Sequence, residues 1–212
     1  MAPGSSDSAL MTLMRAIDAD ERDEAARLLA ASPALARAGR AAGATRGSET
    51  AFFLGRIRRH VYAGDTALHV AAAAYWKDFA QALVAAGADL RARNRRGAEP
   101  LHAASVGSPG ADWWDPRAQA ATIAWLIAAG ADPNAVDMDG VTPLHRAVRT
   151  RSAAAVEALL AGGADATRRN DGGSTPLRLA RLTTGRSGSG SLDAKAQQQE
   201  ILRLFQQHGI RR

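Results

Sequence analysis

Apolar residues along the chain recur at the three- and four-residue spacing of amphipathic helices, in short segments separated by glycine-containing or charged turns. Near the N-terminus, residues 9–18 and 21–31 are predicted to form a helix pair. Near the C-terminus, residues 193–207 are predicted to form the last helix, and residues 1–8 are expected to be a disordered N-terminus. The pattern therefore predicts an all-α fold made of short helices.

A nine-residue stretch occurs four times between these ends. The copies are GDTALHVAA, GAEPLHAAS, GVTPLHRAV and GSTPLRLAR, beginning at Gly64, Gly97, Gly140 and Gly173. The successive glycines are 33, 43 and 33 residues apart. A second stretch stands between the copies, as LVAAGAD, LIAAGAD and LLAGGAD. Self-similarity at such a period is the signature of an array of stacked structural repeats.

The repeated residue types suit a pair of helices. A threonine can cap the first helix and a proline fits its first turn, at Thr66, Thr142, Thr175, Pro143 and Pro176. A glycine that accepts the left-handed conformation can end the second helix, at Gly87, Gly130 and Gly163. One such pair cannot bury its own apolar face, so the pairs are expected to stack on one another.

With this period and these motifs, residues 8–210 resemble the ankyrin-repeat family. The resemblance implies an all-α ankyrin-repeat solenoid of about five helix pairs with short β-turn or finger loops. It also implies a non-enzymatic scaffold that binds a protein partner through the concave face of its first helices and fingers. The alanine-rich composition, with arginine far more frequent than lysine, resembles that of small bacterial ankyrin-repeat proteins.

We expect a single domain over residues 9–212, interrupted by three insertions. Its parts are a cap-like helix pair at 9–31, a long inserted loop at 32–63 and repeats at 64–96, 97–139, 140–172 and 173–212. The repeat at 97–139 has ten extra residues between its helices, and the divergent last repeat has thirteen. The apolar end of the long loop, AFFLGRIRRHVY, is expected to pack on the solenoid as a short helix or a strand pair.

Equivalent turns of a stacked array line up along one edge, and two insertions fall on that edge. The first contains adjacent tryptophans, which either fill a local core or contact a partner. The next turns carry arginines, a residue type enriched in binding hot spots. From the edge, the third repeat and one basic finger, the expected partner contacts are Trp113, Trp114, Arg146, Arg149, Arg151, Arg186, Arg93, Arg95 and Arg96.

Two other functions remain alternatives to protein binding. Arg149, Arg151 and Arg186 form either a solvated face or a notch that binds a small anion or phosphate-containing ligand. Nucleic-acid binding is less favoured, because an acidic finger separates the two basic ones and no aromatic residues alternate with them.

Three histidines recur at the repeat period: His69, His102 and His145. They resemble the structural histidine of the ankyrin motif, which bonds to backbone and hydroxyl groups. A shared metal ion is not expected, since metal–nitrogen distances are only ~2 Å and successive copies lie one repeat apart. Arg178 stands at the fourth equivalent position, where this network is therefore in doubt.

The composition of the 212 residues excludes some kinds of covalent and metal site. They are 46% hydrophobic but only 5% aromatic, contain no cysteine and carry a formal net charge of +6. Disulfides and thiolate metal sites are therefore excluded. Neither a catalytic motif nor a signal or membrane-spanning segment stands out. We expect a monomeric, cytoplasmic protein that is not an enzyme, needs no cofactor and binds an unidentified protein.

Overall fold

The computed structural model describes residues 3–45, 47–48, 50–182 and 191–210. The chain divides into two compact units, Met1–Pro100 and Leu101–Arg212. The described residues are mostly helical, with one pair of two-residue strands among them, which confirms the all-α class. The single domain predicted over residues 9–212 stays a prediction.

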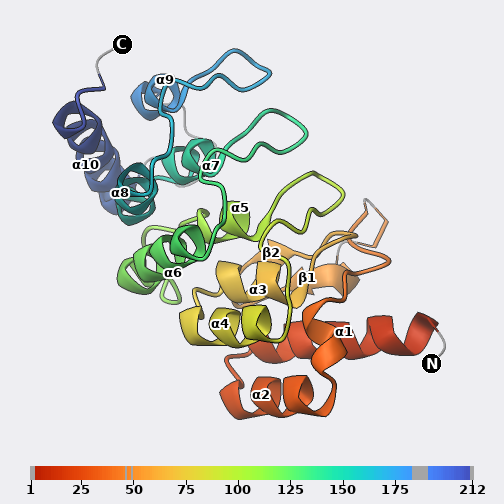
Figure 1. The fold of residues 1–212 in the computed structure, drawn as a ribbon. Coiled ribbons are helices and arrows are strands. Elements are labelled where there is room, and N and C mark those ends of the chain that lie inside the picture. Colours follow the sequence, from red (N-terminus) through yellow and green to blue (C-terminus); the bar gives the residue numbers. More distant parts are fainter. Residues whose placement is uncertain (1–2, 46, 49, 183–190, 211–212) are drawn as a thin grey trace. The chain divides into compact units, whose positions relative to one another are not determined.

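The first unit contains two helix pairs. Its elements are α1 (Pro3–Asp18), α2 (Arg22–Ala31), η1 (Pro33–Ala36), η2 (Thr50–Phe52), β1 (Phe53–Leu54), β2 (Arg59–His60), α3 (Ala67–Ala73) and α4 (Lys77–Ala85). Helix α1 packs against α2 and α3, and α3 packs against α4 (Figure 1).

The first helix begins earlier than predicted. Because α1 starts at Pro3, the expectation of a disordered N-terminus is wrong for residues 3–8. A reason lies at Asp7, whose carboxylate is 2.8 Å from the guanidinium of Arg40. The same carboxylate accepts a 2.9 Å hydrogen bond from the backbone N–H of Ala41. Residues of the long insertion thus hold the start of α1 in place through Asp7.

The insertion at residues 32–63 packs on the first unit and contains a strand pair, one of the two forms expected for its apolar end. Strand β1 pairs antiparallel with β2, with Phe53 opposite His60. The earlier part of the insertion is hydrogen-bonded to residues at the start of the repeat and just before it. Arg40 N donates to Asp65 O at 2.9 Å, and Ala44 N donates to Val61 O at 2.8 Å. Residues 40–44 are therefore hydrogen-bonded to residues 61–65 within the unit.

Asp65 joins this insertion to the repeat that follows. Its buried carboxylate accepts hydrogen bonds from Arg59 at 3.1 Å, from Asn94 Nδ2 at 2.9 Å and from the backbone of Tyr62 at 2.8 Å. Burial alone would raise the pKa of Asp65, but Arg59, His69 and these hydrogen bonds outweigh it and lower the pKa. The ionised carboxylate thus links the strand pair to the finger at residues 87–97.

The second unit has two layers of helices. Helix α5 (Pro100–Ala104) begins at the last residue of the first unit, and the rest are α6 (Pro116–Ala128), α7 (Pro143–Arg149), α8 (Ala153–Ala161), α9 (Pro176–Arg181) and α10 (Leu192–Gln207). Helix α8 packs between α6 and α10, while α7 packs against α8 and α9 (Figure 1). Their shared core contains Leu126, Leu144, Val156 and Phe205.

The helix boundaries follow the predicted capping residues. The hydroxyl of Thr142 accepts from the N–H of His145 at 3.3 Å, and that of Thr175 accepts from Arg178 at 3.2 Å. After α8, Gly163 has φ of 88°, a conformation that costs glycine little. The caps predicted from the repeated motif at these positions are confirmed.

The repeated histidines bind each helix pair to the finger that comes next. The Nε2 atoms of His69, His102 and His145 lie 3.0, 3.1 and 2.9 Å from the carbonyl oxygens of Ala98, Val141 and Ser174. Because a carbonyl only accepts, each Nε2 carries the proton. All three rings are buried, so the structure gives these histidines structural contacts.

Candidate partner-binding surface

Two fingers project from the second unit, at residues 130–140 and 163–173 (Figure 1). Each is stiffened from within: Asp137 Oδ1 accepts from the N–H of Val141 at 3.0 Å, and Asn170 Oδ1 accepts from Ser174 N at 2.9 Å. The N–H of Asp171 also donates to Asp139 O at 3.0 Å, which joins the two fingers. They therefore present their side chains from a fixed backbone.

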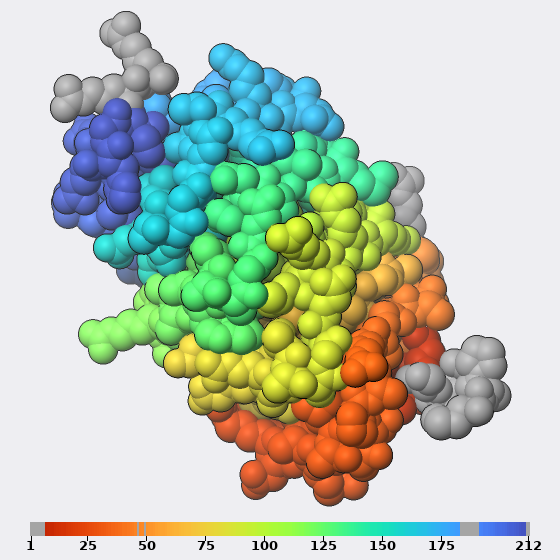
Figure 2. Space-filling model, in the orientation of Figure 1, coloured from red at the N-terminus to blue at the C-terminus, as the bar shows by residue number. Residues whose placement is uncertain are grey.

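We use the name finger face for five exposed side chains on these fingers and the neighbouring first helices: Met138, Asp139, Arg149, Arg168 and Leu182. Met138 is 71% exposed at a finger tip, and Leu182 is 44% exposed just after α9. Figure 2 shows the green to light-blue part of the chain that includes these fingers and helices as a continuous surface. Exposed apolar side chains and arginines are residue types that occur at binding surfaces.

The two arginines of the finger face lie close enough to act on one buried histidine. Burial lowers the pKa of His145, while its bond to Ser174 and the charge of Asp137 act in the opposite direction. The positive charges of Arg149 and Arg168 lower it further. Helix α7 and the finger at residues 163–173 therefore each contribute one positive charge that acts on His145, against the negative charge of Asp137.

Arg146 is held inside the unit. Its Nη2 donates to Asp137 Oδ2 at 2.7 Å, and the side chain is only 16% exposed. Burial would raise the pKa of Asp137, but hydrogen bonds from Arg146, Asp139 and Val141 lower it overall. Arg146 thus supports a finger through Asp137, and its partner contact stays a prediction.

Arg151 is buried, so the structure gives no support to its prediction as a partner contact. It occupies the tight turn before α8 with φ of 58°, and its guanidinium donates to Gln198 Oε1 at 2.7 Å and to Leu182 O at 3.4 Å. Its donors therefore stabilise the last helix pair, and the anion-binding notch predicted from Arg149, Arg151 and Arg186 loses its central member. Arg186 lies outside the described residues.

The two tryptophans of the insertion are both half-buried. The indole of Trp114 donates to the buried side chain of Gln119 at 2.8 Å. The insertion also meets the turn after α7, where Gly107 N donates to Thr150 Oγ1 at 3.0 Å. Trp114 therefore has a structural contact within its unit, and partner contacts by Trp113 and Trp114 stay predictions.

The basic finger of the first unit is partly tied to its own unit. Arg93 is 3.4 Å from Glu99, and Arg95 donates to the carbonyl of Ala44. The guanidinium groups of Arg95 and Arg96 lie over the ring of Tyr62, at 5.2 and 5.7 Å from its centroid. All three side chains stay exposed at the surface, so their partner contacts stay predictions.

Metal and membrane sites have no counterpart in the part of the chain that the structure describes. Its histidines and carboxylates nowhere form a cluster of three or more that could hold a metal ion. Of the helices given above, none combines the length and apolar character that a membrane span needs.

Sequence reasoning missed Met138 and Leu182. A weak signal for Met138 was present, since it is the large apolar residue in a finger tip whose neighbours, Asp137 and Asp139, are acidic. Leu182 gave no separate signal, because leucine at a helix end is usually part of the core.

Comparisons with known families agree with this architecture. Residues 63–95 match the family model of the ankyrin repeat. Residues 126–180 match a model described as ankyrin repeats (many copies). The comparison with curated proteins found no match.

Proposed function

Because this chain is an ankyrin-repeat protein, and such repeats are generally protein–protein interaction modules, we propose that it binds a protein partner through the finger face. The observation that carries the proposal is the exposure of Met138, Leu182, Arg149 and Arg168 on the two fingers and at the ends of α7 and α9. A partner would bury the apolar side chains and place acidic groups against the arginines.

The rest of the proposal concerns the whole chain. We propose that the protein is a non-enzymatic scaffold and that it acts as a monomer in the cytoplasm. The lack of cysteine suits a reducing compartment. Trp113, at the half-buried rim of its insertion, and the basic finger with Arg93, Arg95 and Arg96 are secondary contact candidates.

A pair of double variants tests the finger face. Met138→Ala/Arg149→Gln removes one exposed apolar side chain and one charge from it. Leu192→Ala/Arg203→Gln removes the same two kinds of group from α10, where Leu192 is 84% exposed and Arg203 is exposed. Equal circular dichroism and equal melting temperatures would show that both variants keep the fold.

Wild-type protein serves as bait in lysate of the source cells, and each retained protein is purified for calorimetry. We expect the finger-face variant to bind the partner at least about tenfold more weakly, as for an interface hot spot, with the α10 variant unchanged. A partner that binds both variants with equal affinity would contradict the finger face.

A further inference from the structure

The tip of the finger at residues 87–97 carries two adjacent arginines, Arg95 and Arg96. They are the central residues of a turn that is closed by the N–H of Gly97, which donates to Asn94 O at 2.7 Å. The side chain of Asn94 also holds the turn, since its Oδ1 accepts from the N–H of Arg96 at 2.9 Å. Both arginines are exposed at the surface of the first unit.

The guanidinium groups of both arginines lie over one aromatic ring. They are 5.2 and 5.7 Å from the centroid of the Tyr62 ring, a range in which a cation is attracted to the ring face. Arg95 is held further, because its backbone N–H donates to Ala63 O at 2.7 Å and its Nη2 donates to the carbonyl of Ala44. A guanidinium has five N–H donors and this side-chain contact uses one, so Arg95 keeps donors for a ligand.

Positive charge dominates this finger. Residues 87–97 contain four arginines and a single acidic residue. The buried carboxylate of Glu99, just beyond the finger, lies 3.4 Å from Arg93. Arg95 forms no ion pair with any of the described residues. The fingertip therefore has an excess of positive charge that attracts acidic groups.

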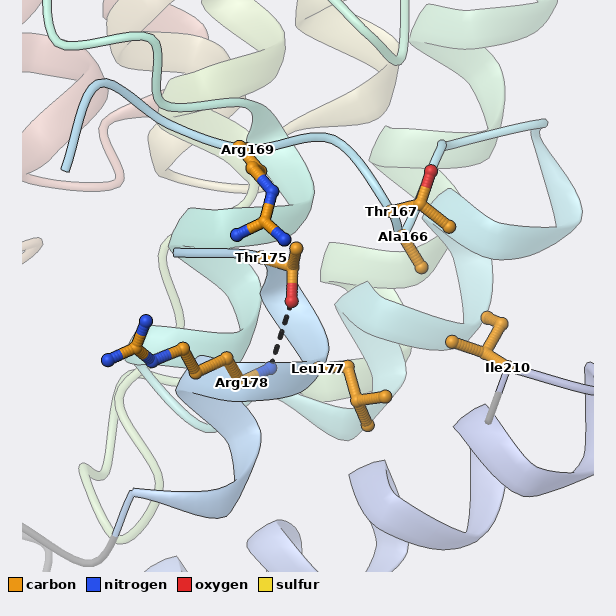
Figure 3. Close-up of a pocket in the computed structure, with 7 residues that line it drawn as sticks. All are labelled: Ala166, Thr167, Arg169, Thr175, Leu177, Arg178 and Ile210. Atoms are coloured by element: carbon orange, nitrogen blue, oxygen red, sulfur yellow. Dashed lines mark hydrogen bonds between the residues drawn. The ribbon is translucent and has the colours of Figure 1, made fainter. Parts of the chain in front are cut away.

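The second unit offers a comparison, in two exposed arginines that line a pocket of about 380 Å³ (Figure 3). The side chain of Arg178 runs away from that of Arg169, so the two groups do not converge. Arg169 Nη1 donates to the carbonyl of Gly173 at 2.8 Å. This pair has the same charge as the fingertip pair but no common position, which makes it a matched control.

We propose that the basic fingertip, which we define as Tyr62, Arg95 and Arg96, binds an acidic segment of a protein partner. Carboxylates of aspartate or glutamate residues lie against the two guanidinium groups, whose planar donor forks suit them. Because the Tyr62 ring already holds both side chains, less conformational entropy is lost when they bind. A nucleic-acid strand fits less well, since its bases stack on aromatic rings and this ring already carries the guanidinium groups. Such binding rests on the proposed function, because the ligand belongs to a protein, but the fingertip shares no residue with the finger face.

Peptide titration of the full chain tests the fingertip by fluorescence anisotropy. The probe is the capped, labelled peptide Gly-Glu-Glu-Glu-Glu-Gly, which is expected to bind to saturation. Its uncharged counterpart, Gly-Gln-Gln-Gln-Gln-Gly, should bind at least about tenfold more weakly, because it lacks the charge-assisted contacts. Arg95→Gln/Arg96→Gln is expected to weaken binding of the acidic peptide about tenfold. Arg169→Gln/Arg178→Gln removes the same charge from the second unit and should leave binding unchanged.

NMR of the tyrosine rings locates the bound peptide in the wild-type protein and needs no variant. The chain has two tyrosines, of which Tyr62 is half-buried and Tyr75 is buried. The acidic peptide should shift the ring signals of Tyr62 and leave those of Tyr75 in place.

Circular dichroism checks the fold of both double variants. If the fingertip variant loses its fold, Arg96→Gln replaces it, since this change leaves the bonds of Arg95 to Ala44 and Ala63 intact and should still weaken binding. Three results would each overturn the proposal: no saturation by the acidic peptide, equal weakening in the two double variants, or unshifted Tyr62 signals at saturation.

An oligothymidylate serves as the nucleic-acid probe. Tighter binding than that of the acidic peptide, with loss of affinity in the fingertip variant, would replace the acidic segment with nucleic acid as the ligand. None of these results bears on the finger face, which the variant of Met138 and Arg149 tests separately.

Discussion

The indole Nε1 of Trp114 donates a 2.8 Å hydrogen bond to Oε1 of Gln119, a side chain that is fully buried. The same oxygen accepts from Ser152 Oγ at 2.7 Å, and Gln119 Nε2 donates to the carbonyl of Ala104 at 2.8 Å. One glutamine therefore connects the insertion, the end of α5 and the start of α8.

Gln119→Ala should destabilise the second unit. The substitution leaves an indole N–H, a hydroxyl and a carbonyl without their partner, and we expect a loss of about 2–4 kcal/mol in the free energy of unfolding. Urea unfolding followed by circular dichroism measures this loss. Gln199→Ala, on the exposed face of α10, should change the free energy little. Equal midpoints for the two variants would show that the network contributes nothing.

Gly43→Ala should destabilise the first unit. A Cβ at this position would lie 2.3 Å from the backbone nitrogen of Ala63 and 2.4 Å from the carbonyl carbon of Tyr62. Backbone must shift to admit it, at a cost of about 1–3 kcal/mol. Gly55→Ala is the matched control, because a Cβ there meets nothing within 4 Å. Thermal unfolding compares the two, and an unshifted melting temperature for Gly43→Ala would refute the close packing of this segment.

Arg146→Gln should loosen a finger. Without its 2.7 Å bond to Asp137, the carboxylate that accepts from the N–H groups of Asp139 and Val141 is less firmly held. We expect a loss of about 1–3 kcal/mol in stability, typical of a hydrogen bond between charged groups. Hydrogen exchange at the amides of Asp139 and Val141 should become faster. Arg149→Gln, an exposed change on the same helix, should leave both amides as they are.

The second unit should lose stability in mild acid through His145. Its pKa is lowered by burial, so the unfolded chain takes up a proton more readily than the folded one. The stability that the neutral ring contributes is present above the ordinary histidine pKa and is lost as pH falls, between about pH 7 and about pH 5. His145→Gln should show a shallower decline than wild type in urea unfolding over this range. If the stability of His145→Gln falls with pH as steeply as that of wild type, the titration of His145 is not the cause of the loss.

Removing a neighbouring charge should move this titration. Arg149→Gln takes away one positive group that disfavours the charged ring, so the pKa of His145 should rise. NMR titration of the imidazole Cε1–H signal measures the change. Arg203→Gln, on exposed α10, removes the same charge elsewhere and should leave the titration in place. An unchanged pKa of His145 in Arg149→Gln would place the Arg149 charge away from the ring.

Elements that depend on local chemistry were predictable from the sequence. Thr142 and His145 stand three residues apart, and both the cap and the buried ring follow from that spacing. Arg151 shows the limit: its main partner, Gln198, is 47 residues away, beyond an insertion, so no local pattern revealed its burial. Exposure of Met138 likewise depends on how the finger is held, which periodicity does not record.

The ten residues added between α5 and α6 lengthen the sequence period but leave the histidine contact to the next finger unchanged. His102 and Val141 are 39 residues apart in sequence, and the Nε2 of His102 lies 3.1 Å from the carbonyl oxygen of Val141. His69 and Ala98 are only 29 residues apart, and the corresponding distance is 3.0 Å. Extra residues at this turn therefore do not disturb the contact between a first helix and the finger that follows it. For protein engineering, the turn is therefore a position where a foreign epitope can be grafted and presented while the fingers keep their geometry.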